Sequence, residues 1–126
     1  MIAIREDYFK AKDKNVLGIF ARDEEKKVFS EEERKSAFAE RLKKGIEFKM
    51  IYTGEEKIRE KLELTTARFI PSEKFPLSSS FIIYDSKVAM VSLKGKLIGV
   101  IVENKEIANT FRSIFNLAWG GSEKYQ

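Results

Sequence analysis

The chain has 126 residues, 43% of them hydrophobic and 12% aromatic, which excludes a disordered protein and predicts a single domain over residues 1–126. It contains no His and no Cys, so disulfides, the usual zinc sites and catalytic systems built on either residue are excluded. The net charge is only +4 and neither half concentrates basic residues, so direct nucleic-acid binding is not expected. No apolar run has membrane-spanning length and no signal peptide is visible, so we expect a cytoplasmic protein with no membrane partner. Abundant Lys and Glu with a single Gln are typical of thermophile proteins.

The chain begins with a helical pattern followed by a buried strand. Apolar residues at helical spacing predict a short helix over Ile4–Lys14. The apolar run Val16–Ala21 predicts a strand that is covered on both faces, as central strands of α/β sheets are. The mixed charges of Arg22–Lys27 are typical of a solvated loop.

Two capping boxes follow, each expected to begin a helix. Ser30–Glu33 is the first, and it begins a helix that ends at Gly45. Apolar side chains at every second position of Ile46–Tyr52 predict a strand. Thr53–Glu56 is the second box and predicts a short helix. The resulting α-β-α-β-α order favours parallel strands joined by helical crossovers.

The second half of the chain is predicted to form strands followed by one helix. Two short turns, Asp85–Lys87 and Lys94–Lys96, predict an antiparallel meander. Asn104 is expected to cap a final helix that covers the sheet and ends at Gly120-Gly121, with a frayed tail over residues 122–126. The fold class is therefore α/β, a mixed sheet with helices on both faces. The predicted strands of this half are Thr65–Ile70, Phe81–Tyr84, Val88–Leu93 and Leu97–Val102.

Three phrases of the sequence carry a family resemblance. They are the helix-Gly-strand phrase Arg41–Tyr52, the strand-loop-strand phrase from Arg68–Pro71 to Phe81–Asp85, and Gly99–Val102 followed by Ile107, Ala108, Phe111, Phe115 and Trp119 of the final helix. In this order and spacing the chain resembles the C-terminal effector-binding domain of the TrmB-like archaeal transcription regulators. That domain is similar in fold to one half of a phospholipase D-type enzyme, and the resemblance covers essentially the whole chain. The family's DNA-binding winged helix has no counterpart here, so DNA binding is not carried over.

The resemblance also allows a test for catalysis, because phospholipase D-type enzymes carry the motif His-x-Lys-x(4)-Asp. Asp85 matches the Asp, which places Ser78 at the position of the His and Ser80 at that of the Lys. A Ser pair supplies neither the covalent nucleophile nor the charge that neutralises phosphate, so no catalytic residue, cofactor or metal is expected. Asp85 is better explained as the head of a tight turn, and each Ser taken alone as part of a polar loop.

A ligand site is expected where the family has its active site. Arg22 follows the first strand directly, and open α/β sheets bind ligands at the carboxyl ends of their strands. We therefore expect Ser78, Ser80, Asp85 and Arg22 to line a pocket for a neutral polar molecule such as a sugar. Asp23, Glu24 and Thr53 occupy comparable positions, although a solvated loop and a helix cap account for them as well.

These observations predict a catalytically inactive sensor or regulatory domain that binds a small effector. The family resemblance implies a homodimer, and ten Phe and one Trp are enough aromatics to supply an interface besides a core. The alternative is a ligand-free dimerisation or protein-interaction module that docks to a partner regulator. A polar cleft at the strand ends would favour the sensor, and a large exposed apolar face would favour the interaction module.

Overall fold

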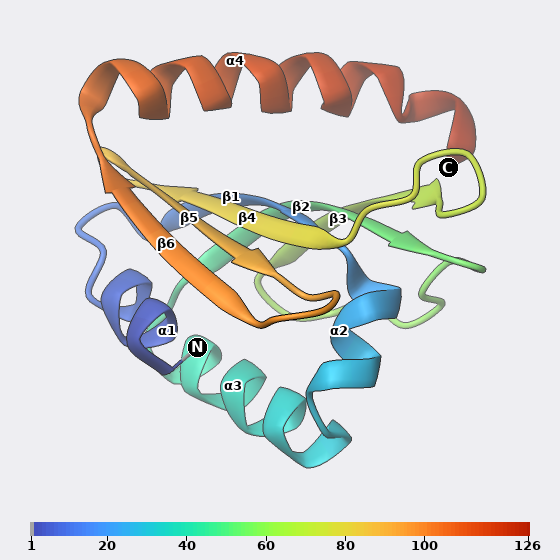
Figure 1. The fold of residues 1–126 in the computed structure, drawn as a ribbon, viewed down its shortest axis with the longest axis horizontal. Coiled ribbons are helices and arrows are strands. Elements are labelled where there is room, and N and C mark those ends of the chain that lie inside the picture. The colour runs from blue at the N-terminus through green and yellow to red at the C-terminus, as the bar shows by residue number, and fades with distance from the viewer. Residues whose placement is uncertain (1) are drawn as a thin grey trace.

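A computed structural model describes residues 2–126 of the chain, arranged around one six-stranded sheet. Figure 1 shows helices on both faces of this sheet, with α4 alone on one side and α1, α2 and α3 on the other. No helix among residues 2–126 is long and apolar enough to cross a membrane. The elements are α1 (Ile2–Phe9), β1 (Asn15–Phe20), α2 (Arg22–Val28), α3 (Glu31–Lys43), β2 (Glu47–Gly54), β3 (Thr65–Pro71), β4 (Ser79–Tyr84), β5 (Lys87–Ser92), β6 (Ile98–Glu103), α4 (Lys105–Gly121) and a final 3-10 turn, η1 (Glu123–Tyr125).

The sheet is mixed, as the sequence predicts, with the strand order β3-β2-β1-β4-β5-β6. β1 pairs in parallel with β2, and β2 pairs in parallel with β3. β4 pairs antiparallel with the other side of β1, and β4, β5 and β6 form the expected meander. The order along the chain therefore reverses between β1 and β4. Because β1, β2 and β3 are parallel, their carboxyl ends lie along one edge of the molecule, next to the start of β4.

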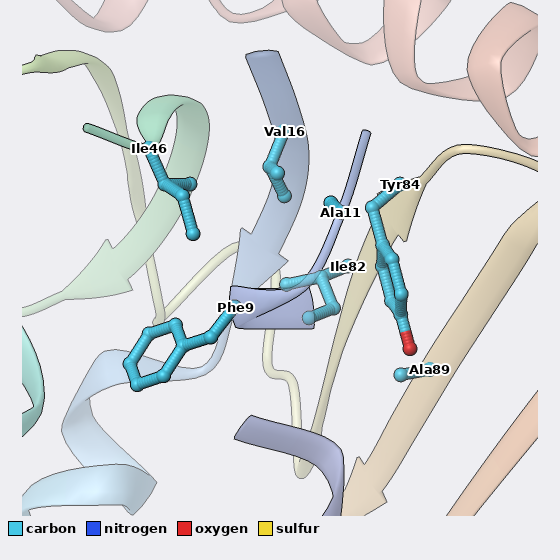
Figure 2. Close-up of a cluster of buried hydrophobic side chains, with 7 residues drawn as sticks. All are labelled: Phe9, Ala11, Val16, Ile46, Ile82, Tyr84 and Ala89. Carbon is cyan, nitrogen blue, oxygen red and sulfur yellow. The ribbon is translucent and has the colours of Figure 1, made fainter. Parts of the chain in front are cut away.

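The core has two layers, one on each face of the sheet. Figure 2 shows the layer beneath α1 and α3, where Val16 of β1 packs with Ile82 and Tyr84 of β4. On the opposite face, Phe115 of α4 is fully buried against the sheet together with Ile83. Burying a large apolar side chain contributes roughly 1.5–3 kcal/mol, so the two layers supply most of the stability of the fold.

The capping box at Ser30 is confirmed. The Ser30 hydroxyl accepts the Glu33 N–H at 3.0 Å, and the Glu33 carboxylate accepts the Ser30 N–H at 3.1 Å. Both bonds satisfy N–H groups that the first turn of α3 leaves without helical partners. These bonds also favour the ionised carboxylate, which holds the pKa of Glu33 below its usual value.

Arg41 near the end of α3 is buried, with only 4% of its surface exposed. Its guanidinium donates to the carbonyls of Ile46 and Leu64 and to the Thr65 hydroxyl, and it lies 4.2 Å from the centre of the Phe48 ring. The side chain thus ties α3 to the first residues of β2 and β3. The same burial lowers the pKa of Arg41.

Two sequence predictions before β3 are wrong. Arg22–Lys27 was expected as a loop, but it forms α2, whose first turn is acidic and whose last turn is basic, the order that the helix dipole favours. The helix expected after Thr53 is absent, and residues 57–62 have no regular structure. Thr53 belongs to β2 and pairs with Ile70, because continuing the parallel ladder satisfies more backbone groups than a local cap.

The two ends of the chain also differ from expectation. α1 ends at Phe9 rather than at Lys14, and the chain then turns so that Lys12 and Asp13 point their backbone N–H groups at Asp85. The expected frayed tail is ordered, because the Gln126 amide pairs with the backbone of β3: it accepts the Phe69 N–H at 2.8 Å and donates to the Phe69 carbonyl at 2.6 Å.

Candidate functional site

A polar cleft lies at the carboxyl ends of β1, β2 and β3, where the strand order reverses. Its volume is about 590 Å³, within the range of small-molecule sites. The walls come from the first turn of α2, the end of β2, the turn after β3, the loop before β4 and the hairpin between β5 and β6. The lining residues are Asp23, Glu24, Gly54, Glu55, Pro71, Ser72, Glu73, Pro76, Leu77, Ser78 and Lys94.

The charge of the cleft is predominantly negative. Four carboxylates line it against one ammonium group, that of Lys94. Two of the carboxylates already have partners: Asp23 accepts the Thr53 hydroxyl at 2.7 Å, and Glu24 lies 3.4 Å from the Lys27 ammonium. Within the described part of the chain no ion pair involves Glu55 or Glu73. These two carboxylates are therefore free to contact a ligand.

Thr53 positions one wall of the cleft. The residue is fully buried in β2, and its hydroxyl donates to Asp23 in the first turn of α2. A buried hydroxyl needs such a partner, because burying it without a hydrogen bond is costly. The bond therefore links the end of β2 to the start of α2 across the edge of the sheet.

A second buried network lies around Ser80, next to the cleft. The Ser80 hydroxyl accepts the Ala21 N–H at 2.9 Å and donates to the Glu25 carboxylate at 2.7 Å. Burial raises the pKa of the Glu25 carboxyl, while the bond from Ser80 and the charges of Arg22 and Arg34 act in the opposite direction. The Ser80 hydroxyl therefore holds α2 against the sheet. Because it already accepts one hydrogen bond and donates another, it is not available to a ligand.

Arg22 opens α2 but does not line the cleft. Burial lowers the pKa of its guanidinium, and the like charge of Arg34 on α3 lowers it further. Glu25 and Glu60 act in the opposite direction. Arg22 therefore belongs to the charged surroundings of Glu25 between α2, α3 and the loop after β2.

Asp85 lies at the opposite end of the sheet from the cleft. It follows the last residue of β4, while Ser80 lies near the start of that strand. Its two carboxylate oxygens accept the backbone N–H groups of Lys12 and Asp13, each at 3.1 Å, and its carbonyl accepts a hydrogen bond from Arg112. Burial opposes ionisation, but the two N–H donors and the Lys12 and Lys87 charges outweigh it and hold the pKa of Asp85 below its usual value.

The four residues expected to share one pocket therefore do not do so. Ser78 alone lines the cleft, Ser80 is buried next to it, Arg22 is the first residue of α2 and is partly exposed, and Asp85 stabilises a turn at the far end. Sequence reasoning missed Glu55, Glu73 and Lys94. Open α/β sheets bind ligands at the carboxyl ends of their strands, and the sequence analysis applied this rule only to the first two strands. Applied to the predicted strand Thr65–Ile70, the same rule would have pointed to Glu73 as well.

The described residues contain no group of three or more Asp or Glu side chains placed to hold a metal ion. The carboxylates of the cleft are instead spread over its different walls. This spacing fits several separate hydrogen bonds to one polar molecule. No model of a known protein family matches the chain, and no curated protein matches it either.

Proposed function

We propose that this chain is a regulatory domain without catalytic activity that binds a small polar ligand in the cleft. In this proposal it is a cytoplasmic, phospholipase D-like domain similar to the effector-binding domains of TrmB-like regulators. The observation that carries the proposal is the position of the cleft: it lies at the carboxyl ends of three parallel strands, at the point where the strand order reverses. Open α/β sheets bind their ligands there.

The chemistry of the cleft supports binding rather than catalysis. The chain has no His or Cys, and the Ser at position 80 is hydrogen-bonded on both its donor and its acceptor side. A nucleophilic hydroxyl needs an adjacent base that is free to take its proton. The neighbour of Ser80 is the buried Glu25, and neither residue lines the cleft.

The lining defines the class of ligand. Ser72, Ser78, Glu55 and Glu73 offer hydroxyls and carboxylates, which bind hydroxyl and ammonium groups. The excess of negative charge disfavours a phosphate. We therefore propose a polyhydroxylated ligand that is positively charged, such as an amino sugar, over a neutral sugar and above all over a sugar phosphate.

Calorimetric titrations with glucosamine, glucose and glucose 6-phosphate test this order. The parent protein is compared with Glu73→Lys, and Glu63→Lys serves as a matched control because it makes the same charge change before β3, at the other end of that strand. Glu73→Lys should weaken glucosamine binding at least about tenfold, since a hydrogen bond to a charged group contributes roughly 1.5–3 kcal/mol, and Glu63→Lys should not. Tighter binding of glucose 6-phosphate than of glucosamine to the parent protein, or equal effects of both variants, would contradict the proposal.

A protein-interaction module that docks to a partner regulator is a second candidate function. The observation in its favour is the number of exposed large apolar side chains on β6 and α4, among which Leu117 has 79% of its surface exposed. Large groups of exposed apolar side chains are typical of surfaces that contact another macromolecule. The two functions do not compete for the same residues, because none of these side chains lines the cleft.

A further inference from the structure

Two cations interrupt the apolar surface that the sheet presents to α4. Ile51 of β2 packs with Phe115 on that face, and Lys49 lies two positions earlier on the same strand, so it points to the same side. Arg68 of β3 is paired in register with Ile51 and therefore also faces α4. Both charged side chains are half-buried. Charged side chains are mostly exposed, so two of them on a core-facing surface require a partner or a function.

Trp119 in the last turn of α4 holds both cations. The Lys49 ammonium lies 4.6 Å and the Arg68 guanidinium carbon 4.5 Å from the centre of its indole ring. Nη1 of Arg68 also donates to the Trp119 carbonyl at 2.6 Å. The electron-rich face of an indole attracts cations at such distances. Because both charges lie against one ring, their separation is at most the sum of the two distances to its centre.

Neither cation has an anionic partner within residues 2–126. No ion pair includes Lys49 or Arg68, and Glu47, which lies on the same side of β2, forms none either. The only side-chain hydrogen bond of the two cations in this part of the chain is the one from Arg68 to Trp119. Like charges this close repel one another, and an anion that contacts both removes the repulsion. The cluster therefore lacks one negatively charged group.

We propose that Lys49 and Arg68 bind a carboxylate from an acidic segment of a partner protein, with Trp119 holding the two cations in place. An ammonium and a guanidinium match a carboxylate in charge and in hydrogen-bonding geometry. The proposal rests on the second candidate function, docking to another protein, and gives the chemistry of that partner. It is independent of the ligand cleft, because neither cation lines it.

The last turn of α4 favours a carboxylate over a phosphate. The carbonyl groups at the end of a helix carry a partial negative charge, and no basic residue of α4 lies in that turn. This partial charge offsets part of the attraction that the two cations exert, so a singly charged group is favoured over a doubly charged one. A nucleic acid would also need more basic contacts than two, because its affinity depends on neutralising many phosphates.

Trp119 is the only Trp of the chain, so its fluorescence reports on this site alone. An anion that draws Lys49 and Arg68 away from the indole should change that fluorescence. The probes are hexaglutamate, glutarate as a small dicarboxylate, and hexathymidylate as a chain of phosphates. We expect a saturable change with hexaglutamate, which should bind more tightly than the other two. Tighter binding of glutarate or of hexathymidylate would contradict an acidic protein segment as the partner.

Lys49→Gln is compared with Lys43→Gln as a matched control. The control removes the same charge from an exposed position in the last turn of α3, which lies on the opposite side of the sheet (Figure 1). Water weakens half-exposed charge pairs, so Lys49→Gln should raise the dissociation constant for hexaglutamate about fivefold, and Lys43→Gln should leave it unchanged. Arg68→Gln should weaken binding as well. Circular dichroism verifies the fold of each variant, and Lys49→Gln breaks no hydrogen bond within residues 2–126.

Three results would overturn the proposal. Equal effects of Lys49→Gln and Lys43→Gln would contradict the site. Calorimetric binding of hexaglutamate without a change in Trp119 fluorescence would contradict the site but not docking to an acidic partner. No binding of hexaglutamate to the parent protein at about 1 mM by either method would contradict both. The second candidate function would then still have its own evidence, the exposed apolar side chains of β6 and α4.

Discussion

Asp85→Ala should lower stability and leave ligand binding intact. The carboxylate accepts the N–H groups of Lys12 and Asp13, and its partial exposure reduces the loss to roughly 1 kcal/mol for each bond. The residue also has a φ of 50°, a left-handed conformation that costs Ala a further 1 kcal/mol or so. The total of about 3 kcal/mol corresponds to a fall in Tm of about 10 °C for a chain of this length.

Two further substitutions separate these contributions. Asp85→Gly restores the freedom to adopt a positive φ but still lacks the acceptor oxygens, so it should lose about 2 kcal/mol. Asp85→Asn keeps one acceptor and tolerates the left-handed conformation, so it should lose about 1 kcal/mol. Thermal denaturation followed by circular dichroism at pH 7 measures all three. Full parental stability in Asp85→Ala, or loss of glucosamine binding without loss of stability, would refute the reasoning.

The effect of Asp85 should also depend on pH. Its pKa is lower in the folded protein than the ordinary value of 3.8, so the carboxylate contributes stability above that value. The contribution is lost as the pH falls through the lowered folded pKa. The difference in Tm between the parent protein and Asp85→Asn should therefore be constant near neutral pH and shrink below about pH 4. A difference that grows on acidification would contradict the assignment.

Two other substitutions test the buried network around Ser80 and the contact of Gln126 with β3. Ser80→Ala should lower the free energy of unfolding by about 2 kcal/mol in chemical denaturation at pH 7, because it leaves the Ala21 N–H and the Glu25 carboxylate without their partner. The loss should be smaller at pH 4, since the raised pKa of Glu25 lets the folded protein hold it protonated there, and an equal loss would argue against the network. Gln126→Ala should speed hydrogen exchange of the Phe69 amide, and unchanged exchange would show that the tail does not protect β3.

Much of the fold follows from local patterns in the sequence. The apolar run at 16–21 predicts a central strand, and β1 does lie between β2 and β4. The capping box at Ser30 and the cap at Asn104 begin α3 and α4 as predicted, because each pairs a side chain with backbone groups only three residues away. The two short turns produce the antiparallel meander for the same reason: their geometry is decided by neighbouring residues.

The elements that the sequence did not predict depend on contacts far along the chain. α2 has no side-chain cap, and it is held by bonds from Thr53 to Asp23 and from Ser80 to Glu25. Arg41 lies in the last turn of α3, where the helix dipole alone would favour a cation, but the backbone of Leu64, 23 residues later, accepts one of its hydrogen bonds. Single-sequence patterns do not contain such partners, because the partners meet only after the sheet has formed.

The candidate site was predicted in part. A cleft does lie at the carboxyl ends of the strands, where the sequence directed attention, and Ser78 lines it. The phospholipase D motif grouped Asp85 with Ser80 only by the number of residues between them, which says nothing about their distance in space. Five residues of extended strand span about 17 Å, so the strand expected at 81–84 already separated the two side chains too far for one small ligand. The predicted strand and the expected shared pocket were therefore incompatible.

Mapping of backbone amide shifts during a glucosamine titration tests the central claim most directly. With the isotope-labelled parent chain, we predict shift changes confined to residues 23–24, 53–55, 71–78 and 94, around the cleft. Glucose 6-phosphate should cause smaller changes at the same concentrations, because Glu55 and Glu73 repel its phosphate. Changes that cluster around Asp85 or on β6 and α4, or no saturable change with glucosamine, would contradict the proposal that this cleft is the ligand site of a regulatory domain.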